Sequence, residues 1–509
     1  MSQDLVIGID SSTSATKAIA WDRSGQAVAQ ARAAIAMSNP LPGHFEQDAE
    51  DWWKSTVSAL QALAAQIDAG RVAALAISNQ RESFGTFRHD GTSLRPATLW
   101  LDERSRQQVS RFGQSFGSER VHAISGKPLD VIPCLYRMIW LREHEPKIFE
   151  KTERMADVHG YLVFRLTGEW ATSTASADPM GVLDMRTQDW SDTILDAAGV
   201  PRNMMSSLSR PGQQLGAISA KSAAQTGLKP GTAVIAGGGD GQCAGTGVDM
   251  LVPGRAYVNM GTAVVSGSFG REYAYELGFR TMNAVAEEGF IYETCLRAGT
   301  FLVEWLLREM FGLDARHERD MFLALEAEAA TSPIGAGGVV ISPYWQGCMM
   351  PHWDSSARGV IAGLSGSSRR GDVYRALLEG IALEQAYSTN RAVEGSGQAI
   401  DHYVAMGGGA SSDLWAQILA DASGRLVLRS ATVEASSLGA AMAAAKGAGW
   451  FGTINEASAA MASKPSRAFE PDPKSAARYA ELLAIHAALW PTLSEWNAKL
   501  TAFTEAGQS

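Results

Sequence analysis

The chain opens with two predicted strands and a short polar turn between them, Leu5-Val-Ile-Gly-Ile-Asp-Ser-Ser-Thr-Ser-Ala-Thr-Lys17. Residues 5–9 and 15–21 are mostly aliphatic, and the turn signal Asp22-Arg-Ser-Gly25 leads into a third strand over residues 28–35. This strand–turn–strand order differs from the strand–loop–helix order of a P-loop, and the chain contains no GxxxxGK[ST] motif. The opening therefore predicts three consecutive strands.

Beyond this opening, predicted strands and helices alternate, which favours an α/β architecture. Residues 51–67 have apolar side chains at helical spacing, and the small residues 438–445 predict a closely packed helix rather than a membrane or partner helix. A chain of 509 residues is long enough for two domains. The segment Asp249-Met-Leu-Val-Pro-Gly254 predicts a boundary between residues 1–249 and 250–509.

The composition is that of an ordinary globular enzyme, with 46% hydrophobic and 19% charged residues. The net charge of −10 and the lack of a run of Lys and Arg disfavour nucleic-acid binding. The four cysteines lie far apart, without a CxxC pair, which is typical of reduced thiols. Since neither a signal-peptide pattern nor an apolar run of about 20 residues occurs, we expect a soluble cytoplasmic protein that binds no membrane.

Four turns rich in glycine or hydroxyl groups are expected at the ends of predicted strands. Glycine lets the backbone approach an anion closely, and the N–H groups of such a turn donate to phosphate oxygens. Any one of these turns is better explained as ordinary turn chemistry, but four in one α/β chain favour a nucleotide site. They span residues 10–16, 237–245, 261–262 and 407–412.

Two of these turns contain an aspartate. Asp10 follows an apolar strand, so its carboxylate would lie at the strand's end, where hydrated Mg²⁺ could bridge it to phosphates. Asp240 lies in the most glycine-rich loop, where an acid could take the proton from an attacking hydroxyl during phosphoryl transfer. The residues alone leave a second interpretation open, in which Asp240 only stabilises a turn.

The segment Gly239-Asp-Gly-Gln-Cys-Ala244 also fits the dinucleotide-binding pattern GxGxxG/A. That pattern requires an acid about 20 residues later, to bind a ribose. The chain has Tyr257-Val-Asn-Met-Gly-Thr262 there, which contains no acid. A nicotinamide-dependent dehydrogenase is therefore disfavoured.

Charged residues beside a tryptophan indicate a different kind of site. Arg81 and Glu82 follow the predicted strand over residues 72–77, and Trp100 and Asp102 lie close together in the next polar segment. Charged groups can bind paired hydroxyls and an indole face can stack on sugar C–H groups, so this set suits a polyhydroxylated ligand. A surface ion-pair cluster beside a core tryptophan is the commoner explanation, and the residues alone leave both open.

Taken together, these motifs resemble the FGGY carbohydrate kinases over nearly the whole chain, from Ile7 to about Gly452. Residues 8–17 are similar to the family's first phosphate hairpin, and residues 237–241 to its second phosphate loop. Gly359-Val-Ile-Ala-Gly-Leu364, with residues 372–379 after it, resembles the family's second signature, and residues 406–413 resemble its adenosine loop. The motifs occur in the family's order, which makes the set more specific than any one of them.

The resemblance implies two ribonuclease-H-like lobes, as in actin, hexokinase and the chaperone ATPases, with a cleft between them. The sugar would bind the N-terminal lobe and ATP the C-terminal lobe, with Asp240 as general base and Asp10 contacting Mg²⁺ through water. Three further groups of residues follow from the resemblance. The sugar pocket would be lined by Arg81, Glu82, Trp100, Asp102 and Gln242; the phosphoryl group would face Thr13, Ser14 and Lys17; the nucleotide would contact Gly261, Thr262, Gly299, Gly408, Gly409 and Asp413.

The resemblance also implies ATP-dependent phosphorylation of a small sugar or polyol. Arg81-Glu82 is similar to the pattern of the family's glycerol kinases, whereas Arg95-Pro96, Leu99-Trp100 and the region 343–345 are similar to its pentulose branch. D-Xylulose, phosphorylated to D-xylulose 5-phosphate, is therefore the expected acceptor. D-Ribulose, glycerol, erythritol and xylitol are alternatives, as is an actin- or chaperone-like ATPase without an acceptor. A homodimer is a further expectation.

Overall fold

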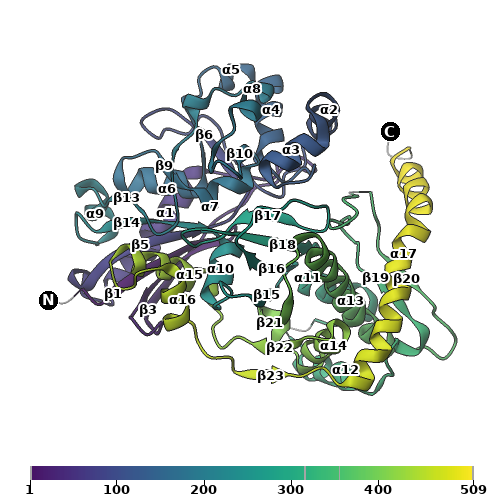
Figure 1. Ribbon diagram of the computed structural model, residues 1–509. Helices are drawn as coiled ribbons and strands as arrows, with labels where there is room; N and C mark the ends of the chain where they lie inside the picture. Colours follow the sequence, from purple (N-terminus) through teal and green to yellow (C-terminus); the bar gives the residue numbers. More distant parts are fainter. Residues whose placement is uncertain (1–2, 315–316, 355, 507–509) are drawn as a thin grey trace.

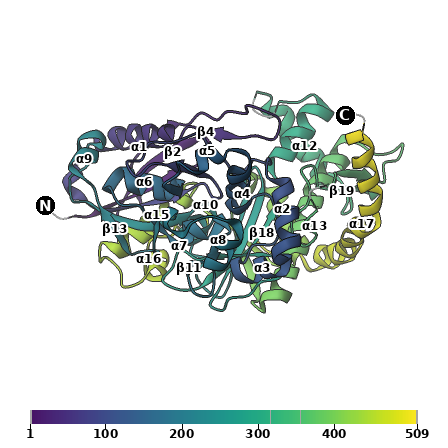
Figure 2. The same ribbon diagram turned by 90° about the horizontal axis from the view of Figure 1, so that it is seen from above.

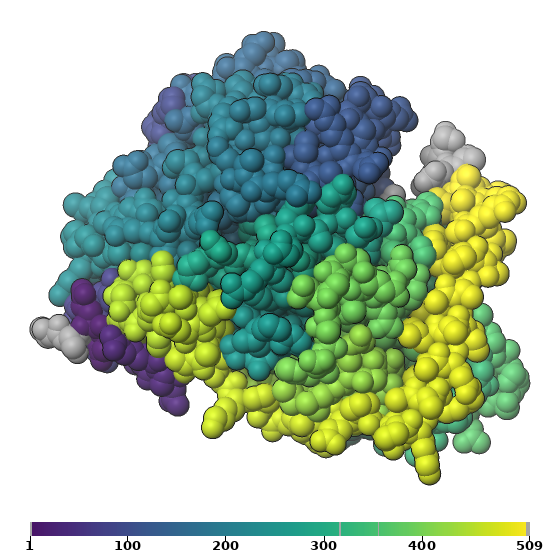
Figure 3. All heavy atoms as spheres, viewed as in Figure 1, coloured from purple at the N-terminus to yellow at the C-terminus, as the bar shows by residue number. Residues whose placement is uncertain are grey.

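The computed structural model describes residues 3–314, 317–354 and 356–506, and it has two lobes, each built around a mixed β-sheet (Figure 1). In Figure 1 the purple-to-teal N-terminal half occupies the upper and left part of the molecule, and most of the green-to-yellow C-terminal half lies below and to the right; Figure 3 shows the same face. A smaller four-stranded sheet adjoins the N-terminal one, in the order β4-β7-β6-β8. Its strands are β4 (Glu46–Gln47), β6 (Phe84–Phe87), β7 (Ala97–Thr98) and β8 (Arg154–Asp157).

The N-terminal sheet has the strand order β13-β14-β5-β1-β2-β3. Strands β1, β2 and β3, which follow one another in the sequence, each run antiparallel to the next, as strands joined by tight turns do. Strands β5 and β14 run parallel to β1. Ser12 closes the first turn, since its N–H and its Oγ both donate to the carbonyl of Ala15. The bounds are β1 (Leu5–Ser11), β2 (Ala15–Trp21), β3 (Ala27–Ala34), β5 (Val72–Asn79), β13 (Gln214–Ala217) and β14 (Ala233–Gly239).

The C-terminal sheet repeats this arrangement, in the order β17-β18-β16-β15-β21-β22-β23. Antiparallel β15, β16 and β18 correspond to β1, β2 and β3, and the parallel β21 and β22 correspond to β5 and β14. The predicted pair of ribonuclease-H-like lobes is thereby confirmed. The bounds are β15 (Gly254–Met260), β16 (Val264–Gly270), β17 (Arg280–Asn283), β18 (Phe290–Leu296), β21 (Ile400–Met406), β22 (Leu426–Arg429) and β23 (Arg467–Phe469).

Strand β1 is buried on both faces, and its side chains point alternately into two hydrophobic cores. Leu5, Ile7 and Ile9 pack in the core that contains α1 (Ala49–Ala64) and α6 (Val158–Thr167). Helix α1 begins two residues before the predicted range because the Asp48 side chain caps it, accepting from the N–H of Glu50. Val6, on the opposite face, packs in the core that contains α15 (Ala435–Gly447).

Helix α15 belongs to the second half of the sequence but packs on the sheet of the first half, against β1 and β5 (Figures 1 and 2). It also crosses α10 (Asp240–Gly247) at close range. A Cβ atom on Gly8 would lie 1.9 Å from the carbonyl oxygen of Ser437, and one on Gly439 would lie 1.9 Å from that of Cys243. The small residues predicted to form a closely packed helix therefore allow this crossing.

The remaining helices pack around the two sheets. None of the helices in the described ranges is long and apolar enough to cross a bilayer, and all four cysteines are free thiols, as predicted. The N-terminal lobe carries α2 (Arg106–Phe112), α3 (Ser118–Ser125), α4 (Cys134–His144), α5 (Pro146–Phe149), α7 (Thr174–Ala177), α8 (Asp192–Ala198) and α9 (Ala220–Thr226). The later helices are α11 (Thr300–Trp305), α12 (Arg319–Thr331), α13 (Arg370–Ser396), α14 (Asp413–Ser423), α16 (Ile454–Met461) and α17 (Pro473–Ala506).

Candidate active site

Two aspartates lie at the carboxyl edge of the N-terminal sheet, where β1, β5 and β14 end side by side. Asp10 is near the end of β1, and Asp240 directly follows β14 as the first residue of α10. The register pairs Asp10 with Ser78 of β5, whose Oγ donates to Asp10 Oδ1 at 3.1 Å. The structure therefore brings the two aspartates singled out from the sequence to one edge of the sheet.

The surroundings of Asp10 suit a cation. Burial, and then the charge of Asp240, raise the pKa of Asp10 to about 7, although Ser78 and Lys17 act in the opposite direction. A divalent cation would relieve this effect by neutralising the two carboxylates. The described residues contain no cluster of three or more His, Cys, Asp or Glu suited to a metal. A cation held by Asp10 would thus take its other ligands from water and phosphate oxygens, as Mg²⁺ does.

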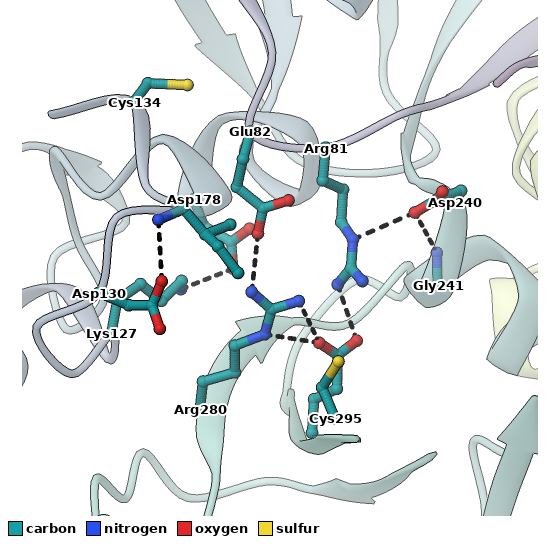
Figure 4. Close-up of polar contacts among 12 residues, drawn as sticks. Arg81, Glu82, Lys127, Asp130, Cys134, Asp178, Asp240, Gly241, Arg280 and Cys295 are labelled. Atoms are coloured by element: carbon teal, nitrogen blue, oxygen red, sulfur yellow. Dashed lines mark hydrogen bonds and ion pairs between the residues drawn. The ribbon is translucent and has the colours of Figure 1, made fainter. Parts of the chain in front are cut away.

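Asp240 is 42% exposed at its side chain and is held at two points. Its Oδ1 accepts from the N–H of Gly241 at 2.8 Å and lies 3.1 Å from Nε of Arg81 (Figure 4). No donor to its second oxygen, Oδ2, is found among the described residues. That oxygen is therefore available to a hydroxyl group of a ligand.

Arg81 and Glu82 lie beside Asp240, and both are buried. Arg81 Nη1 donates to Glu293 Oε2 at 2.7 Å, and Glu82 Oε1 accepts from Arg280 Nη1 at 2.9 Å. Glu82 has a φ of 50°, a left-handed conformation that is uncommon outside glycine. The carbonyl of Glu82 accepts from Arg137 Nη2, which holds the backbone in this conformation. The predicted Arg-Glu pair is thus one part of a buried charge network.

Trp100 connects the predicted sugar pocket to the first hairpin. The Trp100 side chain is partly exposed, and its Nε1 donates to Thr13 Oγ1 at 3.1 Å. Thr13 Oγ1 in turn donates to Gln80 Oε1 at 3.2 Å, in the loop that carries Arg81. Ser14 is exposed at the tip of the hairpin. The structure therefore brings the hydroxyl turn, the indole and the Arg-Glu loop together.

Three other predicted site residues already have partners in the structure. Asp102 is fully buried, and its Oδ2 accepts from the N–H of Phe45 at 2.8 Å and from Arg104. Gln242 is also buried; its Nε2 donates to the carbonyl of Ala175 at 2.7 Å, while its Oε1 has no partner. Lys17 pairs at 2.8 Å with Glu434, just before α15. Asp102 and Gln242 thus stabilise the walls of the site through these buried hydrogen bonds and do not face open space.

The predicted glycines of the C-terminal lobe form a cradle where β15 and β21 end. The N–H of Thr300 donates to the carbonyl of Gly261 at 2.8 Å, and a Cβ atom on Gly299 would lie 2.3 Å from that same oxygen. Gly407 has a φ of 85°, and a Cβ there would approach the backbone next to Gly261. These close approaches bring the turns at residues 261–262, 299–300 and 407–409 together. Asp413 lies farther along, at the start of α14, and pairs with Arg429 at 2.7 Å and with Arg467.

Residues 5–247 match the N-terminal domain of the FGGY family of carbohydrate kinases, and residues 243–448 match its C-terminal domain. The chain belongs to this family. It is 30% identical to a xylulose kinase of Bacillus subtilis over 98% of this chain and 99% of that one. A ligand-bound xylulose kinase of Lactobacillus acidophilus has the same fold, with a TM-score of 0.91 at 22% identity over 97% of this chain and 99% of that one. Glycerol kinase of Plasmodium falciparum with ADP matches with a TM-score of 0.84 at 20% identity over 98% of each chain.

As an FGGY kinase, the protein is a phosphotransferase that acts on a small sugar or polyol. Membership of this family excludes the dehydrogenase interpretation of Gly239-Asp-Gly-Gln-Cys-Ala244. In the structure that segment spans the end of β14 and the start of α10, so its aspartate lies at the sheet edge. The family also disfavours an ATPase that lacks an acceptor.

Two residues of this FGGY kinase's charge network were not expected from its sequence. Arg280 lies on β17 and Glu293 on β18, about 200 residues after the loop they contact. The local signal for Glu293 is a single carboxylate in the otherwise uncharged strand Phe290–Leu296. A lone charge in a buried strand requires a partner, but the sequence does not say which.

Proposed function

We propose that this FGGY kinase transfers the γ-phosphoryl group of ATP to a hydroxyl of D-xylulose, forming D-xylulose 5-phosphate. The observation that carries the proposal is the position of Asp240, half-exposed at the sheet edge beside Asp10 and with Oδ2 free to accept a proton. The full-length similarity to a xylulose kinase supports the choice of acceptor.

Asp240 acts as the general base. It takes the proton of the attacking hydroxyl as that oxygen bonds to the γ-phosphorus and the bond from phosphorus to the bridging β–γ oxygen breaks, which releases ADP. Arg81 and Glu82 bind neighbouring hydroxyls of the acceptor, and the exposed face of Trp100 covers its C–H groups. Asp102 and Gln242 hold the walls of the pocket in place through their buried hydrogen bonds.

The phosphate groups of ATP lie between the two lobes in this proposal. On the N-terminal side, Thr13, Ser14 and Lys17 of the hairpin face the transferring phosphoryl group. On the C-terminal side, Gly261 and Thr262 contact the nucleotide's phosphates, since a glycine turn lets the backbone approach an anion closely. The nucleoside is bordered by Gly299, Gly408, Gly409 and Asp413.

Mg²⁺ fits the donor set at Asp10, where one carboxylate of raised pKa lies beside a second carboxylate. The residue would hold the metal through water, since Mg²⁺ keeps several waters and binds through one or two carboxylates. When bound, the metal neutralises charge on the phosphates. The chain's own contribution is to orient Asp10, through Ser78 Oγ.

The ion pairs beside Asp240 favour an uncharged acceptor. Arg81 is already paired with Glu293, and Arg280 is paired with Glu293 and Glu82. Lys127 is likewise paired with Asp178. A carboxylate-bearing sugar acid would therefore bring a negative charge to a place where these cations are already engaged by carboxylates, which is unfavourable.

A shorter polyol or another pentulose is the second candidate for the acceptor. The observation that favours it is the Arg81-Glu82 pair, whose pattern is similar to that of the family's glycerol kinases. Arg81 keeps its Nε beside Asp240 while its Nη1 is paired with Glu293, and the neighbouring Glu82 is paired with Arg280 through Oε1. D-Ribulose, glycerol, erythritol and xylitol therefore belong in the test.

The experiment is ADP release by purified protein with Mg²⁺-ATP and each acceptor, measured against a blank without acceptor. The panel contains D-xylulose, D-ribulose, their L forms, glycerol, erythritol, xylitol and gluconate, with gluconate as the charged control. Preference for D-xylulose, with phosphorus NMR of the product showing a 5-phosphate, would support the proposal. A higher kcat/KM with a polyol would identify that polyol, instead of D-xylulose, as the acceptor. ATP turnover that is the same with every acceptor as in the blank would refute the function.

A further inference from the structure

A buried chain of charges connects the proposed base to the second half of the sequence (Figure 4). Arg81 Nε lies 3.1 Å from Asp240 Oδ1, and Arg81 Nη1 lies 2.7 Å from Glu293 Oε2. Arg280 lies 2.6 Å from Glu293 Oε1 and 2.9 Å from Glu82 Oε1. Figure 4 shows Arg81 and Arg280 pointing toward each other, Arg81 from the first lobe and Arg280 from the second.

Glu293 lies at the centre of this chain and has no exposed surface. Burial alone would raise the pKa of Glu293, but Arg280 and Arg81 outweigh it and lower the value to about 2. Tyr257 adds a third contact, because its hydroxyl donates to Glu293 Oε2 at 3.0 Å. Both carboxylate oxygens are therefore occupied by hydrogen-bond donors.

The orientation of the Arg81 guanidinium depends on Glu293. An arginine fork and a carboxylate favour a two-point ion pair, in which two N–H groups meet the two oxygens. Arg81 instead meets Asp240 at a single oxygen, Oδ1, while Nη1 is held by Glu293. Without that restraint the guanidinium could turn and cover both oxygens of Asp240.

We propose that Glu293 is a positioning residue, which holds Arg81 so that one oxygen of Asp240 stays free to take a proton. The inference rests on the function proposed above. Glu293 thus takes part in the reaction on the acceptor side, although it belongs to the half of the chain that contains the glycine cradle of the nucleotide site.

Strand β17 pairs with the strand that carries Glu293 and is itself hydrogen-bonded to the first lobe. The N–H of Thr281 donates to the carbonyl of Gly126 at 2.9 Å, and Lys127 Nζ donates to the carbonyl of Thr281. The N–H of Asn283 donates to Asp178, which also pairs with Lys127. This edge of the C-terminal sheet is thus bound to the N-terminal lobe, and movement of the rest of the C-terminal lobe need not displace Glu293.

The test is a double-substitution cycle with Glu293→Gln and Arg81→Gln. With Arg81 present, Glu293→Gln should lower the acceptor-dependent kcat by about 10- to 100-fold, part of the 10²–10⁴-fold that a general base supplies. The KM for ATP should change by less than about two-fold, since the glycine cradle is a separate contact set. With Arg81→Gln already made, Glu293→Gln should lower kcat by less than about three-fold further, because its effect passes through Arg81.

Asp130→Asn is the matched control. Asp130 pairs with Arg297 at 3.2 Å, so this ion pair also joins the two halves but does not touch Arg81. Its kcat should stay within about two-fold of wild type. Each variant is checked by thermal melting before kinetics.

Tyr257→Phe keeps the inference testable if Glu293→Gln does not fold, because it removes one hydrogen bond to Glu293 and no charge. It should lower kcat by roughly three- to ten-fold, which is the scale of one hydrogen bond, with the KM for ATP unchanged.

Two results would overturn the positioning role. One is a folded Glu293→Gln, or in its place Tyr257→Phe, with wild-type kcat; the other is an equal effect of Glu293→Gln with and without Arg81. A wild-type protein that is inactive with every acceptor refutes the proposed function itself, which is a different outcome.

Discussion

Replacing Asp240 with asparagine tests the assignment of the base directly. Asparagine has nearly the same shape, and its Oδ1 can still accept from Gly241 N–H and lie near Arg81 Nε, at the 2.8 and 3.1 Å of the wild type. The change therefore removes the charge and the ability to take a proton, while the start of α10 keeps its hydrogen bonds.

The expected loss follows from what the substitution leaves in place. A general base supplies about 10²–10⁴-fold, which is roughly 2.7–5.4 kcal/mol of transition-state stabilisation. Positioning by the hairpin and by the glycine cradle remains, so phosphoryl transfer should be slow rather than absent. We expect kcat to fall by at least about 100-fold, and the KM for the acceptor to change far less.

The assay is acceptor-dependent ADP release with the acceptor that the panel selects, followed under saturating ATP. ATP affinity is measured separately by calorimetry, because the Gly261 and Gly299 turns do not include Asp240. A folded Asp240→Asn variant with more than about a tenth of the wild-type kcat would refute the base assignment, because that loss is below the range for a general base. Reduced ATP affinity in the same variant would instead indicate that Asp240 contacts the nucleotide.

Three further predictions concern the acceptor pocket, the helix crossing and the cation site. Trp100→Ala should raise the KM for the acceptor about ten-fold and leave the KM for ATP unchanged, with Trp100→Phe as the milder control; equal changes in both would contradict an acceptor role. Gly8→Ala should lower the free energy of unfolding by about 1–3 kcal/mol or more in urea titrations, because its Cβ would meet the Ser437 carbonyl, whereas Gly366→Ala, with nothing within 4 Å, should not. The pKa of Asp10, about 7 in the folded protein against 3.8 as its ordinary value, means that the folded state binds more protons between these pH values, so stability without Mg²⁺ falls as pH rises through them. Asp10→Asn should therefore melt higher than wild type at pH 8 and by a smaller margin near pH 5, and an equal gain at both pH values would contradict this.

The features that could be predicted from the sequence are those with local signals. Apolar runs ending in polar or glycine-rich loops predicted β1, β5, β14, β15 and β21, and with them the places of Asp10 and Asp240 at the strand ends. The small residues around Gly439 likewise predicted the close helix crossing, because only small side chains allow backbones to approach. These inferences required only neighbouring residues.

Pairings between distant residues could not be predicted in this way. Arg81 and Glu82 were expected to face a sugar, but their partners Glu293 and Arg280 come from strands far along the chain. The ion pairs of Asp413 could not be predicted either, since its partners Arg429 and Arg467 lie 16 and 54 residues away. The roles of the site residues, the acceptor, a homodimer and a cytoplasmic location stay predictions.

Two elements from the second half of the sequence are bound to the first lobe, and this bears on how the site works. Helix α15 from the second half covers one face of the first sheet, where Ser437 Oγ donates to the carbonyl of Gly8 at 2.9 Å and accepts from Trp21 Nε1 at 3.1 Å. Strand β17, also from the second half, is bound to the first lobe and contributes Arg280 to the charge network. Because both elements border the proposed acceptor side, that pocket depends on both halves of the chain. We therefore expect any closure of the lobes on their ligands to move the rest of the C-terminal lobe, which would bring the glycine cradle toward a base whose surroundings are already fixed.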